Sequence, residues 1–214
     1  MIWYEWITLG ALGISLSASL FHALRLIRLG KPVDMAPASG SIAPAVRYSI
    51  TGAMNPAKKE SAYLHLPTYL AGIIYHLGTF LSLLLFFFIW LQLPFSRMPV
   101  LILSVFLVLS SSCGFGILIK RGWKNELRAL SNPDDYISNI LVTLFQVGTL
   151  LTLSLPEILP FYFLEASVLF LYIPLSKLKH VIYFFAARYH LGFFFGRRGV
   201  WPPEKRYGSR KVGR

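Results

Sequence analysis

Five apolar stretches, each long enough to cross a lipid bilayer, constrain this sequence more than any other feature. A helix needs about 20 residues to span the hydrocarbon core of a membrane. The stretches cover residues 2–27, 67–93, 99–119, 136–155 and 161–187. Trp3, Tyr4 and Trp6 open the first stretch, as is typical of aromatic side chains at a membrane interface. The sequence therefore predicts an all-α integral membrane protein, folded as a bundle of five transmembrane helices.

The composition supports a membrane location and argues against nucleic-acid binding. Charged residues make up only 14% of the chain, whereas soluble domains have about 25%. The net charge is +12, but the basic residues fall between apolar runs, which is the pattern of a membrane protein. A single cysteine, Cys113, excludes a four-cysteine iron–sulfur site and a covalently attached haem. We therefore expect membrane lipid, and not nucleic acid, around this protein.

Lys and Arg are concentrated in alternate connections. The connections 28–66 and 120–135 and the tail from residue 188 hold most of them, whereas the connections 94–98 and 156–160 hold only Arg97. The positive-inside rule then predicts an outside N-terminus and a cytoplasmic C-terminus. The expected location is the inner (cytoplasmic) membrane, which the chain crosses several times.

We divide the chain into a five-helix membrane domain, residues 1–192, and a basic cytoplasmic tail, residues 193–214. The membrane domain includes the long connection 28–66, which is rich in Pro, Gly and Ser. Neither this connection nor the tail has a pattern that would fold alone. The start of the chain lacks the basic segment and cleavage site of a signal peptide, so we expect a retained first helix. Protein partners should dock on the cytoplasmic face, where the long segments lie.

Two histidines lie at matching depth in the second and fifth predicted helices. His76 is about nine residues, or ~14 Å, from Pro67, and His180 is about eight residues, or ~12 Å, before Arg188. Because the two helices run in opposite directions, the imidazoles can face each other. Such a pair can supply both axial nitrogens of a haem b. The alternative is that each histidine makes an ordinary interhelical hydrogen bond.

The residues around both histidines carry a family resemblance. The sequence around His76 reads Ile-Ile-Tyr-His-Leu-Gly-Thr-Phe, and the one before His180 reads Ile-Pro-Leu-Ser-Lys-Leu-Lys-His. These segments resemble the gamma-subunit (cytochrome b) family of respiratory nitrate reductases, which includes the membrane subunits of heterodisulfide-reductase-like complexes. The resemblance covers these two helices and the topology.

This resemblance implies a haem b membrane subunit with His76 and His180 as iron ligands. The subunit would transfer electrons between the membrane quinone pool (menaquinone or ubiquinone) and cytoplasmic-facing iron–sulfur or catalytic subunits of an oxidoreductase complex. It would be an electron-transfer subunit and not the catalytic one. A nitrate substrate does not follow, because the same membrane module serves many reductases.

The sequence departs from the two-haem members of this family at two positions. Those members carry a second histidine about ten residues after the first ligand and another about eighteen before the second ligand. Phe86 and Tyr162 stand at these places here. Since both ligands of an outer haem are missing together, we expect one haem on the cytoplasmic side.

Four further residues extend the predicted site. His65 lies eleven residues before the first ligand and His190 ten residues after the second, and both steps lead toward the cytoplasm. They are either a second haem-binding pair about 15 Å from the first or interfacial histidines. Lys177 and Arg188 are either partners for haem propionates or basic side chains that reach for the membrane surface.

A membrane protein without redox function, such as a small transporter or a membrane scaffold, is the alternative interpretation. A transporter should show inverted repeats or helices broken at matching positions, and the sequence shows neither. Glu165 is an acid in the fifth predicted helix. It is either an interfacial acid or a proton-carrying group for quinol. The sequence does not locate a quinone site.

Overall fold

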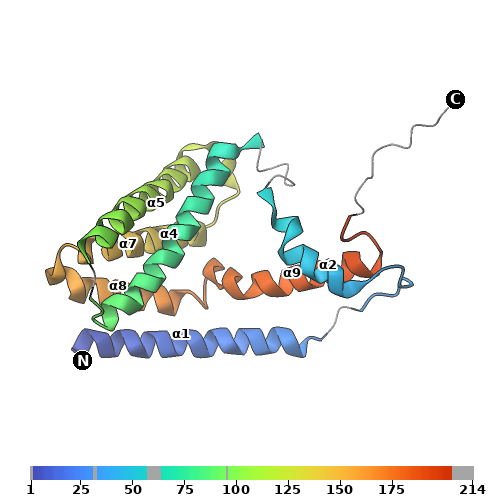
Figure 1. The fold of residues 1–214 in the computed structure, drawn as a ribbon, viewed down its shortest axis with the longest axis horizontal. Helices are drawn as coiled ribbons and strands as arrows, with labels where there is room; N and C mark the ends of the chain where they lie inside the picture. Colours follow the sequence, from blue (N-terminus) through green and yellow to red (C-terminus); the bar gives the residue numbers. More distant parts are fainter. Residues whose placement is uncertain (1, 31–32, 57–63, 95, 204–214) are drawn as a thin grey trace. The chain divides into compact units, whose positions relative to one another are not determined.

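The computed structural model describes residues 2–30, 33–56, 64–94 and 96–203, and these residues form helices and no strands. The long helices are α1 (Trp3–Arg28), α4 (Leu66–Trp90), α5 (Arg97–Trp123), α7 (Pro133–Thr152), α8 (Leu159–Tyr172) and α9 (His180–Arg197) (Figure 1). Two short helices, α2 (Ile42–Ile50) and α6 (Asn125–Ala129), and single 3₁₀ turns at Gly52–Met54, Pro156–Ile158 and Lys177–Lys179 complete the set. The predicted all-α class is confirmed for the described residues.

Three of these helices, α1, α4 and α5, are each long and apolar enough to cross a membrane. A fourth span results if Pro156–Tyr172 and Lys177–Arg197 are taken together as one interrupted segment. The remaining long helix, α7, carries more polar side chains, and Thr143, Gln146 and Thr149 on it are almost completely buried. The helices are therefore compatible with a multi-pass membrane protein.

The predicted continuous helix over 161–187 is wrong, because the chain breaks between α8 and α9. α8 ends at Tyr172, and α9 begins at His180. Pro174 has no N–H for a helical hydrogen bond, and proline disfavours continuation of a helix. The Ser176 side chain accepts a hydrogen bond from Leu178 N–H and so caps the turn that follows. His180 therefore opens a new helix and does not lie in the middle of one.

The chain forms two compact units. The first comprises residues 1–21 and 64–180, and the second comprises residues 22–63 and 181–214. In the first unit, α4 and α5 form an antiparallel hairpin, α7 packs against both, and α8 packs against α7 (Figure 1). α4 ends at Trp90, and the positive φ of 53° at Gln92 just beyond it allows Leu93 N–H to bond back to the Phe88 carbonyl.

Aromatic side chains fill the core of the first unit. Five of them are at most 2% exposed: Phe86, Phe145, Tyr162, Phe163 and Phe170. We call this set the aromatic cluster. Phe145 and Tyr162 stack with ring centres 5.6 Å apart, and Phe86 meets Phe170 edge-on at 5.2 Å. Because aromatic rings bury large apolar areas and add favourable ring contacts, the cluster joins α4, α7 and α8 firmly.

Gln146 on α7 makes the main polar contact within this core. Its Nε2 donates to the Tyr75 carbonyl at 3.1 Å and to Thr79 Oγ1 at 2.9 Å, and its Oε1 accepts from Ser110 Oγ at 2.7 Å. The amide is thus satisfied inside the unit, as a polar group between apolar helices must be. Gly78 permits this approach, since a Cβ at that position would lie 1.9 Å from Ser110 Oγ.

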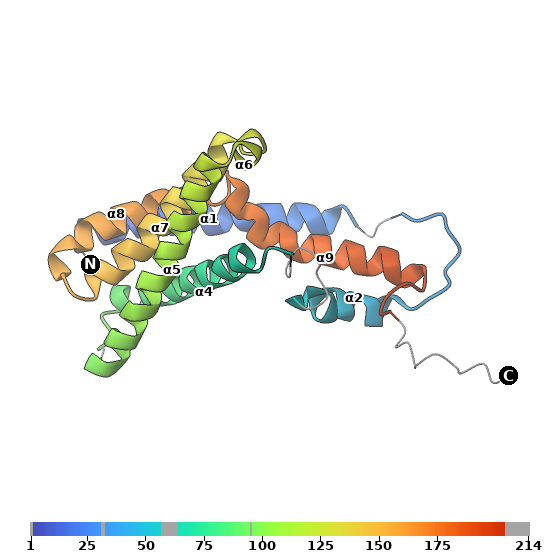
Figure 2. The same cartoon turned by 90° about the horizontal axis from the view of Figure 1, so that it is seen from above.

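In the second unit, α2 lies against the last turns of α9 (Figure 2). Gly192 and Gly196 allow the close contact, because a Cβ at either would lie 2.5 Å from the nearest atom, on Val46 and Ala45 respectively. The predicted domain boundary at residues 192 and 193 therefore falls inside α9, which continues to Arg197. The connection and the start of the tail fold against each other, although neither has a pattern that would fold alone.

Polar contacts hold the remainder of this interface. Arg198 forms an ion pair with Asp34 and lies 3.7 Å from the centre of the Phe194 ring. Arg197 donates to the Ala36 carbonyl at 2.9 Å. The backbone N–H of Ala36, together with the Arg198 cation, holds the pKa of Asp34 below its ordinary value. Tail and connection are therefore linked by charge as well as by packing.

We expect Gly78→Ala to lower the free energy of unfolding by about 1–3 kcal/mol, because the added methyl group overpacks the contact with Ser110. Gly72→Ala is the matched control on the same helix, since a Cβ there meets nothing within 4 Å. Gly72→Ala gains the same helix propensity as Gly78→Ala, up to about 1 kcal/mol, without a clash against Ser110. Thermal unfolding in mild detergent, followed by circular dichroism, compares the two variants. Equal midpoints would contradict the packing described.

Candidate functional site

The structure brings His76 and His180 together within the first unit. His76 lies in the middle of α4, and His180 is the first residue of α9. Their imidazole ring centres are 6.3 Å apart, with an angle of 55° between the ring planes. Two imidazoles on opposite sides of one metal ion, each with a metal–nitrogen bond of about 2.0 Å, have ring centres about 6 Å apart. The observed spacing therefore fits one metal ion held between the two rings.

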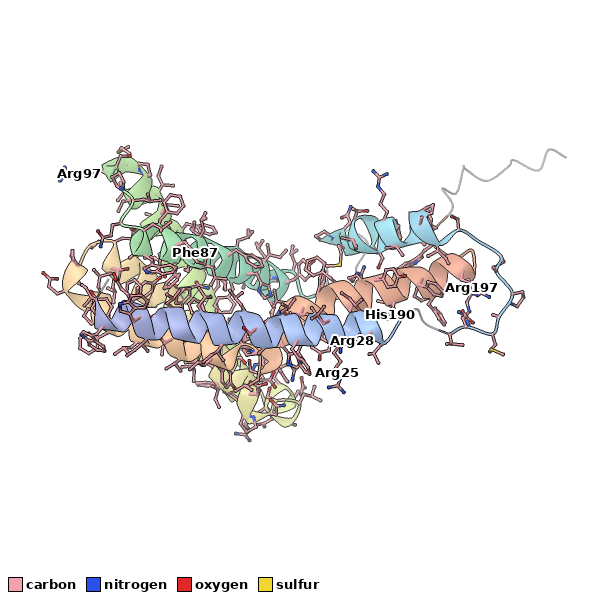
Figure 3. All side chains as sticks on the ribbon, turned by 90° about the horizontal axis from the view of Figure 1, so that it is seen from below. Arg25, Arg28, Phe87, Arg97, His190 and Arg197 are labelled. Atoms are coloured by element: carbon pink, nitrogen blue, oxygen red, sulfur yellow. The ribbon has the colours of Figure 1, made fainter. Side chains whose placement is uncertain are left out.

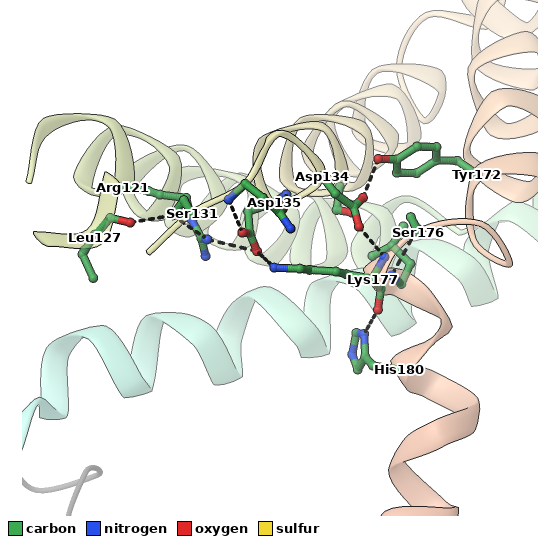
Figure 4. A network of polar contacts seen from close by, with 12 residues as sticks. Arg121, Leu127, Ser131, Asp134, Asp135, Tyr172, Ser176, Lys177 and His180 are labelled. Carbon is green, nitrogen blue, oxygen red and sulfur yellow. Dashed lines mark hydrogen bonds and ion pairs between the residues drawn. The ribbon is translucent and has the colours of Figure 1, made fainter. Parts of the chain in front are cut away.

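The His180 ring has a defined hydrogen bond on the side away from such a metal. Its Nδ1 lies 2.9 Å from the Lys177 carbonyl oxygen (Figure 4). A carbonyl oxygen can only accept, so Nδ1 carries the proton, and Nε2 of the neutral ring keeps a free lone pair. Metal-binding histidines usually have this outer hydrogen bond, which fixes the orientation of the ring.

His76 makes no hydrogen bond to another described residue, so the interhelical bond expected as an alternative does not form there. Its ring contacts are with Tyr75 and His180. Both histidines are exposed on the first unit and are not packed into its core. Gly72, one turn earlier, shares a helix face with His76 and has open space around it, whereas Gly78 faces α5. Gly72 is therefore the residue that leaves room beside the histidine pair.

Asp134 in the first turn of α7 bridges the break that precedes His180 (Figure 4). Its carboxylate accepts a hydrogen bond from the Tyr172 hydroxyl on α8 and, at 2.7 Å, one from the backbone N–H of Lys177. One carboxylate thus binds the chain on both sides of the break. The position of His180 follows from this bridge, because Lys177 lies only three residues earlier.

Asp135 forms the charged part of the same network. Lys177 Nζ lies 2.7 Å and Arg121 Nη1 lies 3.2 Å from its Oδ1. The hydrogen bond from Lys177 lowers the pKa of Asp135 below its ordinary value, and the Arg121 cation adds to the effect. Asp135 also forms a capping box with Asn132 at the start of α7. Lys177, predicted as a partner for a haem propionate, is therefore paired with a carboxylate of this chain.

The other predicted site residues are divided between the two units. His65 belongs to the first unit, where it is exposed just before α4, and His190 belongs to the second unit. Their proposed pairing stays a prediction. Arg188 Nε donates to the Ser49 carbonyl at 2.8 Å, and Ser49 Oγ donates to the Arg188 carbonyl at 2.7 Å. Arg188 therefore links α9 to α2.

Phe86 and Tyr162 stand where the family resemblance would place the ligands of an outer haem, and they contact each other inside the aromatic cluster. Their ring centres are 6.1 Å apart, and the Tyr162 hydroxyl lies 3.1 Å from Thr149 Oγ1. Closely packed aromatic rings thus occupy these two positions on α4 and α8. Both carboxylate oxygens of Glu165 on α8 are buried and form no hydrogen bond with a described residue.

Neither Asp134 nor Asp135 stands out in the sequence as a site residue. The pattern Asn132-Pro-Asp-Asp does signal the start of a helix, with proline at the first helical position and acids in the first turn. No local pattern connects these acids to Lys177, which lies more than forty residues away along the chain. The tertiary fold alone reveals that contact.

We expect Asp135→Asn to lower the free energy of unfolding by about 1 kcal/mol at pH 7, because a partly exposed ion pair contributes about that much. A carboxyl with a lowered pKa stabilises the fold above its ordinary pKa of about 4 and loses that effect as the pH falls through the folded value. The difference between variant and wild type should therefore shrink as the pH falls from 7 toward 3. Thermal unfolding at both pH values checks this, with Glu126→Gln, an exposed acid, as the control. A difference of the same size at both pH values would exclude the ion pair as its source.

Comparisons with family models, curated proteins and solved structures return no match to this chain. The resemblance to nitrate reductase gamma subunits therefore stands on the residues around His76 and His180. The approach of the two rings is an observation independent of that resemblance.

Proposed function

We propose that this protein is a haem b membrane subunit that transfers electrons between membrane quinone and a redox partner on the cytoplasmic face. The approach of the His76 and His180 rings to 6.3 Å carries the proposal. The free Nε2 on His180, left by the bond from Nδ1 to Lys177, gives this ring the tautomer that a ligand needs. In this role the subunit carries electrons, and the chemistry on the final substrate belongs to its partners.

Each part of the site has a task in this proposal. His76 and His180 would hold the iron, and Gly72 leaves space beside them. A haem, when bound, supplies reversible one-electron chemistry at a potential that its axial ligands and surroundings set. The Lys177 carbonyl orients the His180 ring, and Asp134 holds the backbone on which that carbonyl lies.

The proposed topology has five spans in the cytoplasmic membrane, with the N-terminus outside and the C-terminus inside. α1, α4 and α5 are three of them, and α8 with α9 forms an interrupted fourth. We assign α7 from residue 136 onward as the remaining span. Its polar side chains support this assignment, because Gln146 and Thr143 bond to groups on α4 and α5 and so expose few polar atoms to lipid.

The aromatic cluster supports a single haem. Rings of Phe86 and Tyr162 occupy the positions at which two-haem relatives of the nitrate reductase gamma family carry histidines, and both are at most 2% exposed. A second cofactor there would have to displace the best-packed part of the first unit. The remaining option for a second haem is a site held by His65 and His190, and the haem content of His65→Ala and His190→Ala tests it.

On the cytoplasmic face, the expected partners are iron–sulfur or catalytic subunits. The connection 28–66 and the tail supply the docking surface in this proposal, since both are basic and long. Arg188, Arg197 and Arg198 already bond within the second unit. An acidic partner would therefore meet the other basic side chains of this unit first, among them Arg25, Arg28 and Arg47.

A transporter without redox function remains the second candidate, because the break between α8 and α9 resembles the interrupted helices of transporters. Such helices occur in pairs, at corresponding positions of two repeats. The described helices of the first half, α1 and α4, run without a break. The buried carboxyl of Glu165 fits either candidate. Haem content separates them, since a transporter binds none.

We expect about one haem b per wild-type chain and almost none in His76→Ala or His180→Ala, because each variant loses one of two axial ligands. Haem is measured by the difference between dithionite-reduced and oxidised spectra, on protein purified together with its partners. His65→Ala and His190→Ala are the controls and should keep the full content. Two haems per chain, with one lost in either control, would support the second pair. An intact preparation without haem would overturn the proposal.

Gly72→Leu should lower the haem content severalfold, since the new side chain extends into the space beside His76. Gly116→Leu is the control, because that glycine also has open space around it but lies on α5, which carries neither histidine. Circular dichroism confirms that both variants keep their helices. Equal haem content in the two variants would show that Gly72 does not border the cofactor.

A further inference from the structure

The second unit contains a cavity between the last turns of α1 and the middle of α9. Its volume is about 540 Å³, which lies in the range of small-molecule sites. Aliphatic side chains form most of the wall, among them Leu26, Ile27 and Ile182. Pockets of this size with apolar walls and a few polar groups typically bind a small organic ligand.

Two polar rings, Tyr189 and His190, complete the wall of the cavity. They are neighbours on α9 and meet edge-on, with ring centres 5.6 Å apart. Neither the Tyr189 hydroxyl nor the His190 imidazole forms a hydrogen bond with another described residue. Partly buried polar groups normally find partners, so these two have hydrogen-bonding capacity to offer a ligand.

The cavity is bounded by a direct contact between its two helices. Tyr183 on α9 and His22 on α1 share a hydrogen bond of 3.2 Å between the hydroxyl and Nδ1. Their chain neighbours Ile182 and Ala23 line the cavity. Figure 3 shows His190 beside the last turns of α1, which also carry Arg25 and Arg28. The cavity thus lies at the basic end of α1, where the positive-inside rule places a membrane surface.

A ligand for this place needs a flat, mostly apolar body with hydrogen-bonding oxygens and an affinity for the membrane. The headgroup of a quinone has these properties, and its isoprenoid tail partitions into lipid. A phospholipid head would need its phosphate paired with cations, whereas the described residues that line the cavity include no Lys or Arg.

We infer that this cavity binds the headgroup of a membrane quinone, with His190 and Tyr189 hydrogen-bonded to its oxygen atoms. The choice of a quinone rests on the proposed function, which requires one but does not locate it. The site is separate in sequence from the haem ligands: His190 lies ten residues after His180.

The test is photolabelling of the full chain in detergent with an azido derivative of decylbenzoquinone, with excess decylubiquinone as competitor. We expect competable label on peptides that contain residues 23–30 or 182–190. Ala186→Trp fills the cavity and should reduce this label at least tenfold. Ala187→Trp is the matched control, since Ala187 is the exposed neighbour and lines no part of the cavity, and it should label like wild type.

The role of His190 is tested with two substitutions. His190→Phe removes the hydrogen-bonding nitrogens and should weaken competition by decylubiquinone about five- to tenfold, the loss expected for one hydrogen bond. His190→Gln retains a donor and an acceptor and should recover most of the affinity. Label that is not competable, that maps elsewhere, or that is equal in Ala186→Trp and Ala187→Trp would overturn the inference.

Haem content of the same samples keeps this inference apart from the proposed function. If Ala186→Trp keeps its haem and loses the label, the quinone inference and the cytochrome proposal both stand. If wild type binds the label at the cavity but carries no haem, the quinone site stands and the cytochrome proposal fails. If haem is present and competable label is absent from the cavity, the quinone inference fails alone.

Discussion

Asp134 holds together the chain at the break between α8 and α9, where backbone groups lose their helical partners. Where a helix breaks, its N–H groups lose their helical partners and must find others. The Asp134 carboxylate provides one by accepting from Lys177 N–H, and its bond to Tyr172 fixes the other side of the break. The first turn of α7 thereby determines where α9 starts, and His180 is the residue at that start.

The two ends of the first unit differ in how they use ring side chains. In the aromatic cluster, five rings pack into a dry core that leaves little room for a ligand. At the break, two imidazoles approach each other while remaining exposed, and small residues lie nearby. The same helix, α4, contributes Phe86 to the first arrangement and His76 to the second. A single helix bundle can thus be tightly packed at one level and present exposed histidines at another.

The sequence predicts the all-α class from local periodicity, and the His76 and His180 rings do lie near each other. It does not establish five spans, because only three helices, or four with the interrupted pair, are long and apolar enough to cross a membrane. It does not predict the break at Pro174, because hydropathy continues through it. It misses Asp134 and Asp135, whose partners lie far along the chain. It also treats the connection 28–66 and the tail as unstructured, since each exposes its contact surface when considered alone. The contact of Ala45 with Gly196 exists only when both segments are present.

The pairing of α2 with the end of α9 has a consequence for synthesis of the chain. Ala45 leaves the ribosome 147 residues before Gly192, which at about 5–20 residues per second amounts to roughly seven to thirty seconds. During this interval α2 has no packing partner, and its apolar face is free to contact other surfaces. The second unit can therefore complete its folding only after α9 has been synthesised. A chaperone or the membrane surface itself would be the natural temporary partner for α2 during that delay.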